Sequence, residues 1–185
     1  MIKLKLINLS NEKEKIKTMY RVVCLISSII IAVIVIYGIV VARLQGVNVI
    51  GETLVNTQFP PVTIFPWFHA KLVTWLIISM LAFWFSFLEL NKERISRLPK
   101  SIRQVFMLFA FILASIALYE VLFNFTLWGS LMAAGEILGE LNPDQLINPF
   151  PNPEVPWNLV YATKSFFVMT IIFFYTFYFL KKIES

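Results

Sequence analysis

Four long apolar segments dominate the sequence, and they constrain the fold more than any other feature. A helix needs roughly 20 residues to cross the hydrocarbon core of a bilayer. The first and third segments reach that length, and the shorter second and fourth are flanked by charged residues whose long side chains can extend to the interface. We therefore predict an all-α, polytopic membrane protein with four transmembrane helices, at about residues 20–43, 70–90, 103–128 and 162–181.

The composition agrees with lipid as the solvent. Hydrophobic residues make up 58% of the 185-residue chain and charged residues 15%, whereas about 25% of a typical soluble domain is charged. The single cysteine, Cys24, excludes an intrachain disulfide and a thiolate cluster built by this chain alone. We expect residues 1–185 to form one four-helix membrane domain.

If the chain crosses the membrane four times, most of its basic residues fall on one side of the membrane. Of the 16 lysines and arginines, six lie before or at the start of the first span, five lie between the second span and the start of the third, and two lie at or after the end of the fourth. Short basic loops resist translocation, so we predict that both termini and the turn at residues 92–103 are cytoplasmic. The longer loops at residues 44–69 and 129–161 are then outside. We expect a prokaryotic plasma membrane and no nucleic-acid partner, because orientation explains the net charge of +5.

Local signals predict several boundaries. Asn11 and Glu14 have the spacing of a capping box, which predicts a helix start near residue 11. The short turn after the second span predicts that the second and third spans are antiparallel neighbours. The residues beyond Trp128 either prolong the third span or lie on the surface. Cleavage of a signal peptide after Ala42 is an alternative that the length of the first apolar run disfavours.

Small residues spaced three or four positions apart predict helix-packing faces, because they let helix backbones approach closely in lipid. The first span offers two such pairs, and the third carries a stripe of alanines on one face. The predicted packing residues are Ser28, Ala32, Gly38, Ala42, Ala110, Ala114 and Ala117. Tryptophans near the ends of spans are expected to act as interfacial anchors. They are Trp67, Trp128 and Trp157.

Glu120 is the most unusual residue of the third span, because ionisable side chains within a bilayer are costly and often functional. It lies on the side of the helix that carries Asn124, so we expect both residues to face protein rather than lipid. In one interpretation the Glu120 side chain is functional: it relays a proton, binds a cation or forms a salt bridge with another subunit. The other, which we favour, gives Glu120 and Asn124 a role in assembly only.

Residues suited to catalysis or metal binding are sparse. The sequence has no phosphate loop, nucleophile elbow or His-x-x-His pattern. His69 is the only histidine, so it is a weak candidate for a metal ligand, and we interpret it as an interfacial residue. We predict no cofactor and no metal site from this chain, but we expect bound lipid. The aromatic second and fourth spans could line a quinone or pigment site, although we interpret their aromatic side chains as bulky groups that face lipid.

Together these features predict an accessory or structural subunit of a multisubunit integral membrane complex. Its partners would be other membrane subunits and lipid, contacted through helix-packing faces and outer loops. A membrane oxidoreductase, of the respiratory or the ammonia- or methane-monooxygenase type, is one host that fits this architecture by analogy. The alternative is a stand-alone small transporter or a lipid-processing enzyme that uses Glu120.

Overall fold

The computed structural model describes residues 2–44, 50–59, 71–137 and 157–184. Within these ranges the regular structure is helical, with no strand beyond an isolated bridge between Gln58 and Lys71. The helices are α1 (Ile2–Leu44), α2 (Ile50–Asn56), α3 (Leu72–Leu90), α4 (Lys92–Ser96), α5 (Lys100–Ile137) and α6 (Trp157–Glu184). The four long ones, α1, α3, α5 and α6, are apolar enough to cross a membrane, which confirms the prediction of an all-α chain with four candidate spans.

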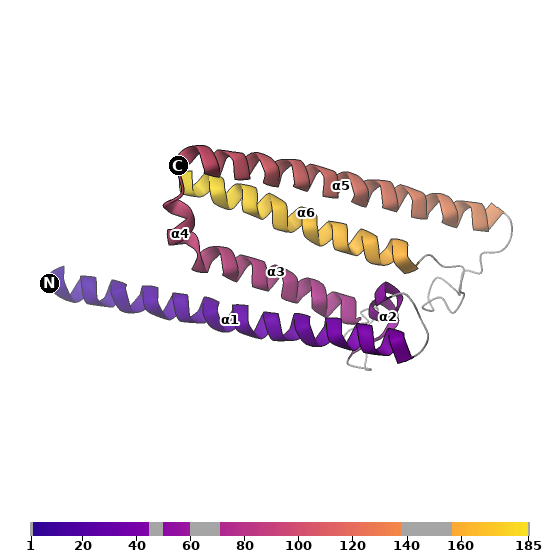
Figure 1. Cartoon of the computed structure of the whole chain (residues 1–185), viewed down its shortest axis with the longest axis horizontal. Coiled ribbons are helices and arrows are strands. Elements are labelled where there is room, and N and C mark those ends of the chain that lie inside the picture. Colours follow the sequence, from indigo (N-terminus) through magenta and orange to yellow (C-terminus); the bar gives the residue numbers. More distant parts are fainter. Residues whose placement is uncertain (1, 45–49, 60–70, 138–156, 185) are drawn as a thin grey trace.

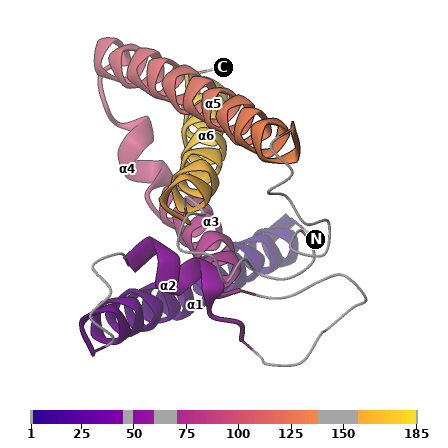
Figure 2. The ribbon, with the colours of Figure 1, turned by 90° about the vertical axis from the view of Figure 1, so that its right-hand side faces the viewer.

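The four long helices stand side by side in a row, in the order α1, α3, α6, α5 (Figure 1, Figure 2). As a result, α3 and α6 have a long helix on both sides, while α1 and α5 form the edges of the row. The prediction that the second and third spans are neighbours is wrong, because α6 lies between α3 and α5. The physical reason is α4, an additional short helix that carries the chain from α3 to α5 without a tight turn (Figure 1).

Both termini lie at the same end of the row, together with α4 (Figure 1). We call this the termini end, and we call the opposite end, which carries α2 and the first residues of α3 and α6, the α2 end. The helix α1 is continuous from Ile2, so Asn11 does not begin a helix as predicted. The helix α5 continues past Trp128 to Ile137, so these residues prolong the third span.

The α2 end contains a hydrophobic core that joins α1, α2 and α3. Its buried members are Ile34, Leu54, Val55, Leu72, Val73 and Leu76. Leu54 of α2 lies against Gly38 of α1, where an added Cβ would approach the Leu54 Cδ2 to 3.0 Å. On the other side of α2, an added Cβ at Gly51 would stand 2.9 Å from the ring of Tyr161 in α6. Because neither glycine has a side chain, α2 can pack closely against both α1 and α6.

Hydrogen bonds fix α2 to the start of α3. The Leu72 amide donates to the Thr57 carbonyl at 3.0 Å. The Lys71 ammonium donates to the Asn56 carbonyl at 3.2 Å. Partial burial lowers the pKa of Lys71 from its ordinary value, because burial disfavours the charged form. The α2 end is thus closed by apolar packing and by hydrogen bonds together.

The helix α6 is tied to both of its neighbours through polar groups. Toward α3, the Trp84 indole donates a hydrogen bond to the Thr176 hydroxyl at 2.8 Å. Toward α5, the Glu184 carboxylate accepts a hydrogen bond from the Gln104 amide at 3.0 Å and lies 3.4 Å from the Lys100 ammonium. The indole bond lies within candidate spans, where no water is at hand to replace a lost partner.

Candidate functional site

One face of α5 is buried against α6. Ala110, Ala114 and Ala117 are buried, and Asn124 continues the same face with 7% of its surface exposed. Alanine leaves room here for the bulky side chains of α6. Aromatic rings also meet across the two helices. The ring of Phe111 in α5 lies 5.6 Å from the ring of Phe177 in α6, measured between centroids. The Asn124 amide is thereby held at a helix–helix seam.

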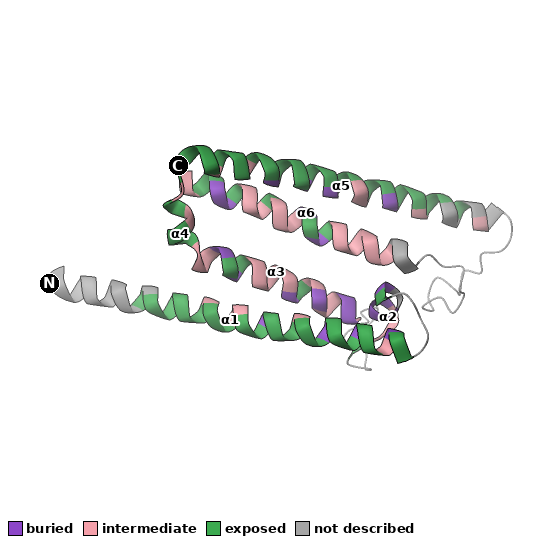
Figure 3. Cartoon of the chain, in the orientation of Figure 1, coloured by how far each residue is buried: buried purple, intermediate pink, exposed green. Residues whose placement is uncertain are grey.

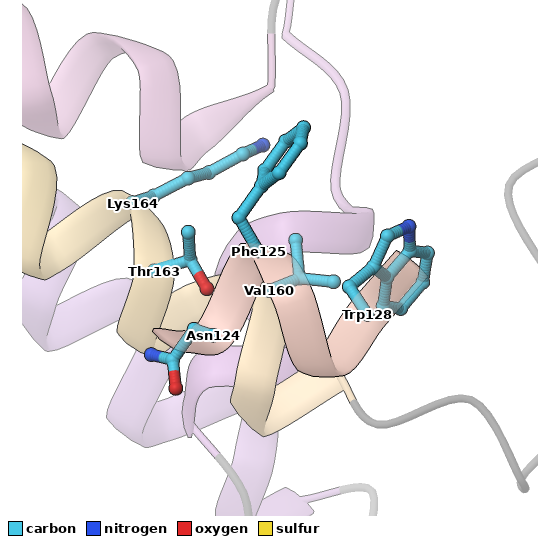
Figure 4. Close-up of a pocket in the computed structure, with 6 residues that line it drawn as sticks. All are labelled: Asn124, Phe125, Trp128, Val160, Thr163 and Lys164. Atoms are coloured by element: carbon cyan, nitrogen blue, oxygen red, sulfur yellow. The ribbon is translucent and has the colours of Figure 1, made fainter. Parts of the chain in front are cut away.

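A pocket of about 280 Å³ opens between α5 and α6 at the far end of this buried face, away from the termini (Figure 4). Its lining residues are Asn124, Phe125 and Trp128 of α5 and Val160, Thr163 and Lys164 of α6. An amide, a hydroxyl and an ammonium group thus share the pocket with two aromatic rings. The surface of the pocket is nevertheless almost entirely apolar, so these polar groups contribute little to it. The pocket therefore suits an apolar group better than a small polar or anionic ligand. The lining residues include no carboxylate, thiol or imidazole, so they supply no set of metal ligands.

Glu120 lies one helical turn before Asn124 and is half-buried, but it does not line this pocket. Within the described ranges no basic side chain forms an ion pair with Glu120. No group of three potential metal ligands occurs in the described part of the chain either. A carboxyl group without a partner is costly within a candidate span, and a hydrogen-bonding group beyond the described residues would offset that cost.

The predicted small-residue pairs of α1 divide into a buried and an exposed pair. Gly38 and Ala42 are buried, and Gly38 receives Leu54 of α2. Ser28 and Ala32 are exposed, so no helix in the described part of the chain covers them.

The predicted interfacial residues are described only in part. Trp128 is half-buried at the pocket between α5 and α6. Trp157 is the first residue of α6. Trp67 and His69 lie outside the described residues.

A second pocket was not predicted from the sequence. It is an apolar groove of about 300 Å³ at the termini end, where α3 and α5 stand apart with α6 between them. Its walls include Trp84 and Leu88 of α3, Phe109 and Leu113 of α5, and Phe173 of α6. We call it the termini-end groove. No local sequence signal marks it, because it exists only where α6 separates two consecutive spans.

Comparison of the chain with protein-family models, with curated proteins and with solved structures found no match in any of the three. What the chain does must therefore be inferred from its own residues. Three features bear on its function: the exposed faces of the edge helices, Glu120, which has no ion-pair partner in the described ranges, and the two pockets.

Proposed function

We propose that the chain is an accessory, non-catalytic subunit of a multisubunit membrane complex, docked through the edge helix α1. The open row of helices carries this proposal. In a closed four-helix bundle each helix packs on neighbours around a shared core, but α1 and α5 each have a long helix on one side only. Figure 3 shows both edge helices exposed along most of their length, and their exposed side chains are largely apolar.

The docking face that we propose on α1 contains Ser28 and Ala32, which are exposed and lie one turn apart. The Ser28 hydroxyl donates to the Cys24 carbonyl at 2.8 Å, so its need for a hydrogen-bond partner is met within the helix. Packing, rather than the hydrophobic effect, drives helix association in lipid. A surface of small residues therefore favours contact with another helix, whose backbone can approach closely.

Glu120 has an assembly role in the same proposal. It is half-buried near the seam between α5 and α6 and has no ion-pair partner among the described residues. A hydrogen-bond donor of a neighbouring subunit would offset the cost of burying its carboxyl group. A transporter or lipid-processing enzyme that uses Glu120 has less support, because Glu120 does not line the pocket between α5 and α6.

Extraction in a mild detergent, followed by native electrophoresis and mass spectrometry, tests the subunit proposal. We expect the chain to migrate in one band with other membrane polypeptides at fixed stoichiometry, and their identity would name the host. A membrane oxidoreductase of the respiratory or monooxygenase type is the host that we test first, by analogy of architecture. Migration of the chain alone, or as a homo-oligomer, would overturn the proposal.

Ala32→Trp tests the docking face, with Val33→Trp as its matched control. Both residues are exposed, but successive helical residues are about 100° apart, so Val33 points away from the Ser28 and Ala32 face. We expect Ala32→Trp to release the chain from the complex and Val33→Trp to leave it bound. Equal retention of both variants would exclude this face as the contact.

Glu120→Gln separates the assembly role from a proton or cation role. Glutamine keeps the shape and the hydrogen-bonding capacity of the side chain but removes its charge. We expect the variant to stay in the complex and the complex to stay active. Loss of the host's activity in an intact Glu120→Gln complex would instead assign Glu120 to proton or cation transfer.

The proposed orientation places both termini and α4 in the cytoplasm of a prokaryotic cell. Its support is the concentration of lysine and arginine in the segments at the termini end. Ser96 of α4 and Leu44 of α1 are exposed at opposite ends of the row. In a Cys24→Ala background, Leu44→Cys should react with an impermeant thiol reagent in intact cells, and Ser96→Cys only after the membrane is opened. The reverse pattern would contradict the orientation.

A further inference from the structure

The termini-end groove offers an almost purely apolar surface. The Trp84 indole, its main polar group, already donates its N–H to the Thr176 hydroxyl. The groove follows α5 from Phe106 to Leu113, seven residues or about 10 Å at about 1.5 Å per residue. Its volume of about 300 Å³ is at the lower limit of about 300–1,000 Å³ for ligand pockets. Such a groove suits a single hydrocarbon chain.

The mouth of the groove is strongly basic. Ile95 and Leu98 line it beside α4, and the segment from residue 89 to residue 103 carries five basic and two acidic residues. One of the acids, Glu93, lies 3.9 Å from Lys17 of α1, so part of its charge is already neutralised. Arg94 and Arg97 form no ion pair within the described ranges.

Arg103 adds an independent observation. It lies one turn before Phe106, which lines the groove. Its Nε atom is buried and has no hydrogen-bond partner in the described chain. A buried guanidinium nitrogen without an acceptor costs free energy, and arginine forms strong hydrogen bonds with carboxylate and phosphate oxygens alike. This nitrogen is shielded from solvent, so a phosphate oxygen reaches it only when the Arg103 side chain reorients.

We propose that the termini-end groove is a specific site for an anionic phospholipid, with one acyl chain in the groove and the phosphate bound by Arg94, Arg97 and Arg103. A phospholipid fits both features of the site. Its acyl chain matches the apolar groove, and its phosphate matches the basic residues at headgroup level. Anionic lipids are concentrated at the cytoplasmic surface, which is where the termini end is expected to lie. The proposal does not depend on whether the chain is a subunit of a complex.

Quenching of Trp84 fluorescence by brominated lipid tests the site in the full chain, reconstituted in nanodiscs. The other four tryptophans are replaced by phenylalanine. Phosphatidylglycerol with brominated chains, added at low fraction to unbrominated phosphatidylcholine, should quench Trp84 at about a tenfold lower fraction than brominated phosphatidylcholine does. That ratio corresponds to about 1.4 kcal/mol of preference. Equal quenching by the two lipids would overturn the proposal, because it would mean ordinary annular contact.

Charge removal tests the headgroup part of the site. Arg94→Gln and Arg97→Gln should each raise the half-quenching fraction of phosphatidylglycerol up to about fivefold, since a basic residue near an anionic surface contributes about 1 kcal/mol. Arg43→Gln, at the α2 end and exposed, is the matched control and should leave it unchanged. Equal effects of all three substitutions would contradict a local site.

Native mass spectrometry of the wild-type chain gives a readout that does not depend on the tryptophan replacements. We expect one phosphatidylglycerol to stay bound through detergent exchange and to be lost in the Arg94→Gln, Arg97→Gln double variant. Retention of a quinone or another neutral apolar molecule in its place would overturn the phospholipid assignment.

Discussion

The two ends of the helix row differ in how the connecting segments pack against the long helices. At the α2 end, a short helix packs against α1, α3 and α6, and its Leu54 is only 1% exposed. At the termini end, α4 connects α3 to α5 but leaves the termini-end groove open beside it. The comparison teaches that α1, α3 and α6 are held together where the connecting segment supplies apolar side chains and close glycine contacts, although a pocket opens between α5 and α6 at the same end. The row stays open where the connecting segment is basic.

The largest expected effect is at the α2 end. Leu54→Ala removes the side chain that α2 inserts against Gly38, and it should lower the free energy of unfolding by about 2–5 kcal/mol. Leu25→Ala, at a position of α1 that is 62% exposed, is the control and should change stability far less. Chemical unfolding in detergent micelles, followed by circular dichroism, measures both. Equal losses would mean that the α2 end is not a packed core.

Substitution of Gly51 should change the free energy of unfolding less, and the control substitution at Gly129 should change it in the opposite direction. Gly51→Ala should lower the free energy of unfolding by about 1–3 kcal/mol, because the new methyl group meets the Tyr161 ring. Gly129→Ala in α5 meets nothing within 4 Å, so it should raise stability by about 0.5–1 kcal/mol. Adding Tyr161→Leu to Gly51→Ala should recover part of the loss. A neutral Gly51→Ala would show that α2 packs more loosely than proposed.

The seam between α3 and α6 should show a more modest effect. Trp84→Phe keeps a ring beside the groove but removes the N–H that Thr176 accepts, at a cost of about 0.5–1.5 kcal/mol. A double-mutant cycle with Thr176→Val isolates the hydrogen bond from the packing. Additive losses in that cycle would contradict a direct interaction between the two side chains.

The smallest effect is expected at the ion pair of the termini end. Lys100→Gln removes a partner of Glu184 at an exposed position, and such pairs contribute about 0–1 kcal/mol. Unfolding at low and high salt measures this term. A loss comparable to that of Leu54→Ala would reverse the comparison between the two ends.

Periodicity and charge predicted the parts of the fold that depend on local sequence. The four apolar segments gave the candidate spans, because each must satisfy its own backbone hydrogen bonds in lipid. The spacing of Ala110, Ala114 and Ala117 placed them on one face, and the structure buries all three. A helix presents such a face whatever its neighbours are.

The order of the helices could not be predicted in the same way. The short turn after α3 suggested that α5 packs beside it, but turn length alone does not say whether a later helix inserts between them. The helix α2 was missed within a loop expected at residues 44–69, although Ile50 and Leu54 are spaced one helical turn apart. The termini-end groove follows from helix order, so it was inaccessible to sequence patterns.

Cysteine cross-linking of helix pairs tests the central claim, that α6 separates α3 from α5. In a Cys24→Ala background, Phe85→Cys with Tyr175→Cys joins positions whose rings lie 3.9 Å apart between centroids. Leu88→Cys with Phe109→Cys spans the termini-end groove. Under mild oxidation we predict a cross-link in the α3–α6 pair and none in the α3–α5 pair. A cross-link between α3 and α5, with none between α3 and α6, would contradict the row and remove the groove with it.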